Sequence, residues 1–477
     1  MKTATSFRFK SRIALMISFL SLFFFSFNCY SQNWKELGSG SNALNPNNLF
    51  LSITTDNTGN VYAAGDFTDN NGYNYVAKWN GTNWSELGTG SNALNANSYI
   101  STIATDTIGN VYAAGYFTDS NGYYYVAKWD GTSWSELGSD SNALHANTII
   151  NTLITDKTGN LFAAGSFIDP AGHPYVAKWT GTKWIELGLD TNALAASAPI
   201  RSIAADKLGN IYAGGDFVDT GNKIYVAKWN GTSWSELGIG PTALIESDTT
   251  GQILSITIDA NGNIYAAGTF TDTNGYYYVG KWNDVKWQEL GSGSNILSAD
   301  TVIGSNSGIN SIATDASGNI YAAGYFKDAH GNPYVAKWNG STWSELGSGF
   351  TNIFSVASYV WTIATDKIGN IFAAGNFTDS SGVLYVAEYT GTPGLVKTVQ
   401  QVNNFIVYPN PLTDQLIIES SENGTVQLFD MIGHIVYRGK LDQTKLFINT
   451  NCFSKGTYLL QLSDDMGNSS VKEIVKQ

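Results

Sequence analysis

The sequence predicts an all-β protein built mainly from one repeated unit, and three observations support this. The text of residues 106–117, Asp-Thr-Ile-Gly-Asn-Val-Tyr-Ala-Ala-Gly-Tyr-Phe, recurs with small changes to give seven copies along the 477 residues. Glycine is abundant (50 residues) and 13% of the chain is aromatic, as many short strands and tight turns require. Apolar residues show no helical spacing within the copies. The leading aspartates of the copies are Asp56, Asp106, Asp156, Asp206, Asp259, Asp315 and Asp366.

Each copy reads as four short strands, which we call a, b, c and d. In the second copy they are residues 99–105, 110–117, 124–129 and 134–137. Asp-x-x-Gly-Asn between strands a and b is typical of a tight turn, because aspartate caps its own backbone and glycine accepts positive φ. Asn-Gly between strands c and d, as at Asn80-Gly81, predicts two-residue type I′ hairpins. Seven antiparallel units of this kind predict a seven-bladed β-propeller over residues 32–390.

The two ends of the repeat array predict that the ring is closed. The seventh copy stops at Tyr389 and lacks the Trp-x-Glu-Leu-Gly of strand d, while an orphan copy of that strand stands at residues 34–38. The N-terminal strand should therefore complete blade seven and leave no free edge.

A charge exchange supports the same closure. Strand c carries lysine in six blades but Glu388 in the seventh, and the orphan strand d carries Lys35 after its tryptophan. With a type I′ turn, Lys78 pairs with Asn83 and lies diagonal to Ser85 on one face. The equivalent pair in blade seven is Glu388 with Lys35. The six lysines are Lys78, Lys128, Lys178, Lys228, Lys281 and Lys337.

Thirteen of the 14 tryptophans lie on strands c and d, for example Trp129 and Trp134. Aromatic faces at regular intervals would suit sugar stacking. Packing between blades is the simpler explanation, because a structural role requires the same residue in every copy.

Length variation is confined to one type of connection. The distance from the leading aspartate to the strand-c aromatic is 23 residues in every copy, and all additions fall between strand d and the next strand a, in 241–252 and 292–308. These d–a connections emerge with the b–c loops at one end of the propeller, the top, and variable loops on a constant scaffold usually carry binding. Glu246, Asp248 and Asp300 are acids without counterparts in the regular copies. We predict that they contact a cationic or metal-bridged ligand group, whereas a neutral glycan would use nearby aromatic residues. The alternative is that these loops have diverged without a function on the solvent-exposed rim.

The b–c loop also carries an aspartate in each blade. A ring of acids offers a calcium site, but aspartate before Asn-Gly or Ser-Gly is more simply a turn former. No copy has the glycine and glutamate positions of an EF-hand loop, so no metal site is assigned. These aspartates are Asp69, Asp119, Asp169, Asp219, Asp272, Asp328 and Asp379.

Charge and histidine content argue against nucleic-acid binding and against catalysis. Beyond the first 31 residues, 22 basic residues face 39 acidic ones, a formal net charge of −17, which disfavours nucleic acid as a partner. The four histidines neither recur nor pair with a nucleophile at a recognisable spacing, so no catalytic residue is predicted. They are His145, His173, His330 and His434.

The N-terminus has the pattern of a secretory signal peptide over residues 1–31. Four basic residues precede an apolar run at 13–27, and cleavage is expected between Ser31 and Gln32. A lipoprotein signal with lipid on Cys29 is the alternative. Either signal predicts export through the periplasm to the outer surface or the medium.

The copies resemble known propeller repeats. Tyr-x-x-Gly followed by aromatics on strands c and d is similar to the kelch repeat of galactose-oxidase-like propellers, and Asp-x-x-Gly-Asn-Ile-Tyr is similar to NHL-type repeats. The kelch Gly-Gly doublet is Ala-Gly here, except at Gly214-Gly215. No copper ligand set matches, so the resemblance implies an architecture and no chemistry.

After a linker at 391–401, the repeat gives way to short alternating strands over residues 402–477, which predict a small β-sandwich. Tyr408-Pro409-Asn410-Pro411, the Asp-x-x-Gly turn ending at Gly433, and Gly456-x-Tyr458 resemble the C-terminal sorting domain of type IX secretion in Bacteroidetes. The resemblance implies Sec export, recognition by the type IX machinery, and removal of the domain as cargo is released or attached to the surface.

These observations together predict a secreted or surface-displayed propeller for binding or adhesion, with a glycan or a protein as its ligand and no cofactor unless calcium binds. The alternative is an extracellular propeller enzyme that acts on glycans.

Overall fold

The computed structural model describes residues 34–244, 251–291, 295, 297, 308–325, 327, 333–347, 359–379, 381–390, 405–420, 423–430, 435–442, 444–451, 453–463 and 469–477. The chain divides into two compact units, Met1–Thr390 and Gly391–Gln477. The predicted signal peptide, its cleavage site at Ser31 and Gln32, and the predicted linker lie outside the described residues.

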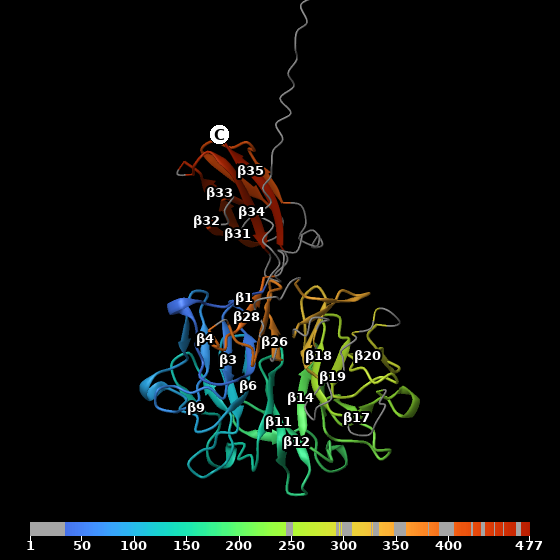
Figure 1. Cartoon of the computed structure of the whole chain (residues 1–477). Helices are drawn as coiled ribbons and strands as arrows, with labels where there is room; N and C mark the ends of the chain where they lie inside the picture. Colours follow the sequence, from blue (N-terminus) through green and yellow to red (C-terminus); the bar gives the residue numbers. More distant parts are fainter. Residues whose placement is uncertain are drawn as a thin grey trace, which may run out of the picture. The chain divides into compact units, whose positions relative to one another are not determined.

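The first unit consists of seven four-stranded antiparallel sheets, each in the order a-b-c-d (Figure 1). The inner a strands are β2 (Phe50–Thr55), β6 (Ile100–Thr105), β10 (Ile150–Thr155), β14 (Ile200–Ala205), β18 (Ile253–Ile258), β22 (Ile309–Thr314) and β26 (Val360–Thr365). The b strands are β3 (Val61–Gly65), β7 (Val111–Gly115), β11 (Leu161–Ile168), β15 (Ile211–Gly215), β19 (Ile264–Gly268), β23 (Ile320–Gly324) and β27 (Ile371–Gly375).

The outer strands are shorter. The c strands are β4 (Ala77–Trp79), β8 (Ala127–Trp129), β12 (Pro174–Trp179), β16 (Val226–Trp229), β20 (Gly280–Trp282), β24 (Ala336–Trp338) and β28 (Ala387–Tyr389). The d strands are β5 (Trp84–Glu86), β9 (Trp134–Glu136), β13 (Trp184–Glu186), β17 (Trp234–Leu237), β21 (Trp287–Glu289), β25 (Trp343–Glu345) and β1 (Trp34–Glu36). Single 3-10 turns follow five d strands: η1 (Gly40–Asn42), η2 (Gly90–Asn92), η3 (Asp140–Asn142), η4 (Asp190–Asn192) and η5 (Gly240–Thr242).

The predicted closure is confirmed. Strand β1 pairs with β28, so the seventh sheet has the order β1-β28-β27-β26 and joins both ends of the array. Each inner strand contacts the inner strands of both neighbouring blades, and β26 contacts β2. The seven blades therefore form a complete ring, as the sequence predicts.

The c–d hairpins differ from the prediction. Trp79 pairs with Trp84 and Lys78 with Ser85, so the turn has four residues and Lys78 does not pair with Asn83. The reason is the Asn80 side chain, whose Oδ1 accepts the backbone N–H groups of residues 82 and 83 at 2.9 and 3.0 Å. This side-chain cap replaces the type I′ turn. The same register places Lys35 directly opposite Glu388, and their side chains form an ion pair at 3.0 Å.

A ring of tryptophan hydrogen bonds joins each blade to the one before it. The indole Nε1 of every strand-d tryptophan donates to a leucine carbonyl of the preceding blade. In each blade this leucine directly follows the glutamate of strand d. The bond between Trp34 and Leu346, 2.8 Å long, closes the ring between blades six and seven. The others are Trp84 to Leu37, Trp134 to Leu87, Trp184 to Leu137, Trp234 to Leu187, Trp287 to Leu237 and Trp343 to Leu290.

The apolar core lies between blades rather than within one blade. One cluster, for example, packs Tyr62 and Leu87 of blade one against Ile100, Val111 and Phe117 of blade two. The strand-c tryptophans pack against these clusters and lie 5.6 to 5.9 Å from the strand-d tryptophan rings. Inter-blade packing thus accounts for the recurrence of tryptophan, as the simpler explanation expects.

The C-terminal unit has two sheets that share one core. The first has the order β29 (Ile406–Tyr408), β30 (Gln415–Glu419) and β33 (Lys445–Asn449). The second has the order β32 (Ile435–Leu441), β31 (Gly424–Asp430), β34 (Gly456–Ser463) and β35 (Ser469–Lys476). Leu416 and Ile418 of the first sheet pack with Val426, Leu428 and Leu460 of the second. The predicted small β-sandwich is therefore confirmed.

We expect charge reversal at the closing strand to be corrected by its partner. Lys35→Glu or Glu388→Lys alone places like charges opposite each other and should lower the free energy of unfolding by about 1 kcal/mol, the range of an exposed ion pair. The double variant restores the pair in the opposite sense. Thermal and urea unfolding of all four proteins measures the coupling, and purely additive losses would contradict the pairing of β1 with β28.

Candidate functional site

Every inner strand carries a β-bulge at its second residue. In blade one, Phe50 pairs with Gly65 and Ser52 with Ala64, which leaves Leu51 without a partner on strand b. A bulge redirects the extra side chain and often lies beside a binding site. The bulged residues are Leu51, Ser101, Asn151, Arg201, Leu254, Asn310 and Trp361. They differ between blades, although the strand around them repeats almost unchanged.

A second variable position lies next to the bulge. A Cβ at Gly65 would collide with the carbonyl oxygen of Leu49, so strand b needs glycine there. The N–H of Asp66 then donates to that carbonyl at 2.9 Å, and the same bond recurs in every blade. The residues after this glycine are Asp66, Tyr116, Ser166, Asp216, Thr269, Tyr325 and Asn376. We call these residues, the bulged residues and the residue before each inner strand the channel mouth.

The channel mouth lies where the d–a connections enter the inner strands, the end predicted for binding. The sequence signal of the mouth residues is variation within an otherwise constant repeat, which differs from the variation in loop length that predicts a site in the d–a connections. Glu246, Asp248 and Asp300, the acids predicted to contact a ligand, lie outside the described residues.

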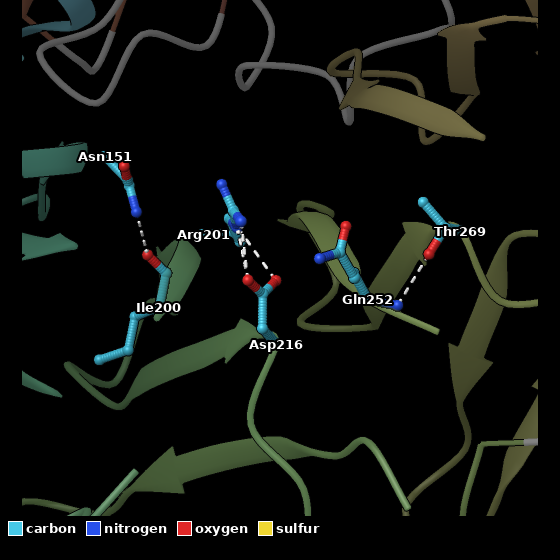
Figure 2. Close-up of polar contacts among 6 residues, drawn as sticks. All are labelled: Asn151, Ile200, Arg201, Asp216, Gln252 and Thr269. Carbon is cyan, nitrogen blue, oxygen red and sulfur yellow. Dashed lines mark hydrogen bonds and ion pairs between the residues drawn. The ribbon is translucent and has the colours of Figure 1, made fainter. Parts of the chain in front are cut away.

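Polar contacts at the mouth change from blade to blade (Figure 2). Asn151 Nδ2 donates to the carbonyl of Ile200 in the next blade at 2.9 Å. Arg201 instead turns to its own blade and holds Asp216 with contacts of 2.7, 3.0 and 3.1 Å. The N–H of Gln252 donates to Thr269 Oγ1 at 2.9 Å. The mouth therefore offers a different polar group in each of these neighbouring blades.

The Arg201–Asp216 pair is exposed and electrostatically neutral. The Arg201 side chain keeps 40% of its surface exposed, and Asp216 keeps 17%. Hydrogen bonding to Asp216 raises the pKa of Arg201, although partial burial of the guanidinium acts in the opposite direction.

Aromatic side chains gather at two parts of the mouth. Tyr99 and Tyr116 of blade two lie 5.1 Å apart between ring centroids and are 42% and 39% exposed. In blades six and seven, Tyr325 lies 4.0 Å from Tyr359 and 5.5 Å from Trp361. Such faces bind apolar surfaces and the C–H faces of sugars.

Two buried donors at this second cluster have no hydrogen-bond partner in the described structure: Nδ2 of Asn310 and Nε1 of Trp361. They occupy bulged positions equivalent to Ser101 and Asn151, whose side chains donate to the next blade at 2.8 and 2.9 Å. An unsatisfied buried donor is unfavourable. An acceptor group supplied here would therefore be stabilising.

The aspartates of the b–c loops act as turn formers in the described loops. Asp69 Oδ1 accepts the N–H groups of Asn71 and Tyr73, both at 2.9 Å. Asp119, Asp169, Asp219, Asp272 and Asp379 accept backbone N–H groups of their own loops in the same way. Asp328 lies outside the described residues. Across the described part of the chain, no group of three or more His, Cys, Asp or Glu side chains is placed to hold a metal ion.

The glutamate of strand d faces these aspartates. Burial, with repulsion from Asp272, raises the pKa of Glu289 to about 7. The same causes raise the pKa of Glu86 opposite Asp69. In blade one the acids line a recess of about 280 Å³ and in blade two, where they are Asp119 and Glu136, one of about 190 Å³. Because the pair recurs around the ring, it is a feature of the scaffold and not a single catalytic centre.

In the C-terminal unit, the residues of the predicted sorting motif form hydrogen bonds to β35, to β30 and to the segment before β34. Asn410 Nδ2 donates to the carbonyl of Glu473, and its Oδ1 accepts the N–H of Val475, both at 2.9 Å. The Tyr408 hydroxyl donates to Glu419 at 3.0 Å, and the Tyr458 hydroxyl donates to the carbonyl of Ser454 at 2.7 Å. Pro409 and Pro411 flank Asn410, Gly456 begins β34, and Gly433 lies outside the described residues.

This unit also matches a known family. Residues 406–477 match the secretion system C-terminal sorting domain. The C-terminal unit is a type IX sorting domain. A chain with this domain is directed to the cell surface or the extracellular space. Over the described residues, no helix has the length and apolar character needed to span a membrane.

The comparison with solved structures finds several similar chains. The chain is similar to PorZ, a bacterial surface component of the type IX secretion system of Porphyromonas gingivalis, with 14% identity, a TM-score of 0.49, and coverage of 91% of this chain and 60% of PorZ. It is also similar to YCF48 from Cyanidioschyzon merolae (14% identity, TM-score 0.43, 75% and 98% covered) and to an ulvan lyase (12%, 0.41, 76% and 96%). The chain thus spans less than two thirds of PorZ, and none of these similarities identifies a ligand or an activity. A comparison with curated proteins finds no match.

The raised pKa of Glu289 predicts that stability falls as pH rises. The folded state holds this proton between the ordinary value of 4.5 and about 7, so its contribution is complete below pH 4.5 and is lost as pH rises through 7. Burial alone would raise the pKa values of Asp56, Asp156, Asp206 and Asp259, but hydrogen bonds outweigh it and lower them, so these groups titrate below this window. Glu289→Gln should therefore raise the melting temperature at pH 8 by roughly 1–3 °C and leave it unchanged at pH 4.5. Glu86→Gln is the matched control with a smaller expected gain, and an equal gain at both pH values would contradict this assignment.

We expect deletion of residues 402–477 to leave a folded propeller inside the cell envelope. The blades take no strand from the C-terminal unit, so the loss should affect export and not folding. Cell fractionation with immunoblotting measures the distribution, and circular dichroism of the purified truncated protein tests its fold. Normal release of the truncated chain would contradict the sorting role.

Proposed function

We propose that the chain is a secreted or surface-displayed binding protein without catalytic activity, whose ligand is a glycan or a surface protein held at the top of the propeller. The observation that supports this is the contrast between constant and variable positions. Strands, turns and acid pairs repeat around the ring, while side chains at the channel mouth and the lengths of the d–a connections differ. Variation on a rigid scaffold is the usual arrangement of a binding surface.

The alternative function is an extracellular enzyme that acts on glycans. Glu289, with a pKa near 7 and Asp272 as its neighbour, has the properties of a general acid. The same Glu–Asp arrangement stands in other blades, however, whereas catalysis requires one assembled centre. This repetition favours binding over catalysis.

Export to this location requires the type IX secretion machinery as a partner of the sorting domain. A protein delivered outside the cell meets glycans and the surfaces of other cells, which fits either class of ligand. The formal net charge of −17 beyond residue 31 disfavours polyanionic ligands such as nucleic acid.

The function can be tested with the chain that lacks residues 1–31. We expect it to bind a glycan on an array, or a protein on intact cells, without releasing new reducing ends or unsaturated products from bound glycans. Turnover of any bound glycan would favour the enzyme. Failure to bind both glycans and cell-surface proteins would overturn the binding function.

The acids of the long connections have a separate expected effect. Replacing Glu246, Asp248 and Asp300 together by Ala should weaken a ligand with a cationic group by about three- to tenfold, because exposed charge pairs contribute about 0–1 kcal/mol each. An uncharged ligand should bind as before. Titration of both ligand types against the variant and the parent measures the difference, and unchanged affinity for the cationic ligand would remove these acids from the site.

A further inference from the structure

We propose that the channel mouth binds an uncharged oligosaccharide, with Tyr99 and Tyr116 as a stacking platform and the Arg201–Asp216 pair as the group that recognises hydroxyls. This inference rests on the proposed binding function and names the ligand class and the residues of the same site. Four observations carry it: exposed aromatic faces, a neutral planar polar pair, incomplete hydrogen bonding at the second aromatic cluster, and the charge of the mouth.

The first observation is the exposure of the Tyr99–Tyr116 pair. Most large rings of the propeller are buried between blades, whereas these two keep 42% and 39% of their surface open beside the inner strands. Their planes are tilted by 39° at a centroid distance of 5.1 Å. Two tilted open faces suit successive sugar rings, whose C–H faces are apolar while their edges carry hydroxyls.

The second observation is the hydrogen-bonding capacity left in Arg201. Its Nε and Nη2 hold Asp216, while Nη1 makes no hydrogen bond with a described residue. Asp216 retains acceptor capacity in the same plane. A planar donor and acceptor side by side match two adjacent hydroxyls of a sugar. Asn151 and Gln252 add amide groups from the neighbouring blades (Figure 2).

The third observation concerns blades six and seven. Tyr325, Tyr359 and Trp361 form a second aromatic group, and the buried donors of Asn310 and Trp361 lack partners there. These donors are buried, so a sugar stacked on the rings would satisfy one only after the covering side chains move. We therefore assign this group to a second sugar unit of the same ligand.

The fourth observation is the small net charge of the described mouth. Arg201 is neutralised by Asp216, and Asp66 holds the side-chain amide of Asn48 at 2.7 Å. Lys327, from the b–c loop of blade six, lies over the Tyr359 ring at 5.4 Å. Acids and bases at the mouth thus balance closely, and neither a polyanionic nor a polycationic glycan finds an excess of opposite charge.

The test uses the chain without residues 1–31 on an array of uncharged, sulfated, uronic-acid and amino-sugar glycans. We expect uncharged oligosaccharides to bind. Tyr116→Ala and Arg201→Gln should each weaken the best ligand by about tenfold, the range of one stacking contact or one polar pair. Tyr116→Phe keeps the ring and should bind like the parent.

Tyr73→Ala is the matched control, since Tyr73 is 43% exposed in a repeated b–c loop outside the mouth. Melting temperatures establish that each variant is folded. Glycan binding that survives Tyr116→Ala and Arg201→Gln, or that is lost in Tyr73→Ala, overturns the site and leaves the binding function intact. Binding of charged glycans alone, or of no glycan, overturns the ligand class, and capture of a surface protein then still supports the proposed function.

Discussion

The hydrogen bond from each strand-d tryptophan to the preceding blade is the interaction on which the propeller depends. A single blade of four short strands cannot bury its own faces, so each core cluster is completed by residues of the neighbouring blade. The indole joins the outer strands of neighbouring blades, and the bond from Trp34 to Leu346 completes the circle. Without β1, blade seven would expose an edge and blade six would lose its outer contact.

This ring of equal contacts explains why most of the repeat cannot change. The Asp56 side chain caps its turn by accepting the N–H groups of Thr58 and Asn60. Gly65 allows the close approach of strand a, and Lys78 lies over the Tyr62 ring at 5.7 Å. The turn cap and the glycine contact recur in every blade, and the lysine–aromatic contact is found for five of the described c strands. The bulged residue of strand a is less constrained, because it pairs with no residue of strand b. Diversity is therefore concentrated at the mouth.

The repeated acids illustrate how recurrence separates structure from function. A carboxylate with a pKa near 7, such as Glu289, would mark a catalytic site if it occurred once. Here the pair of strand-d glutamate and b–c aspartate stands in blade after blade, and the aspartate already bonds to its own loop. The raised pKa is a consequence of packing the outer strand against an acidic turn.

The sequence by itself determined the number of blades, the closing strand, the pairing of Lys35 with Glu388 and the sorting domain. Each follows from a local motif or from the point at which the first and last repeats are interrupted. It did not determine the register of the c–d hairpins, since the Asn80 side chain competes with the turn that Asn-Gly favours. It also did not single out Tyr99, Tyr116, Arg201 and Asp216. These residues stand on different strands of blades two and four. Only the tertiary structure brings the residue before each inner strand, the bulged residue and the residue after the strand-b glycine to the same end of the propeller.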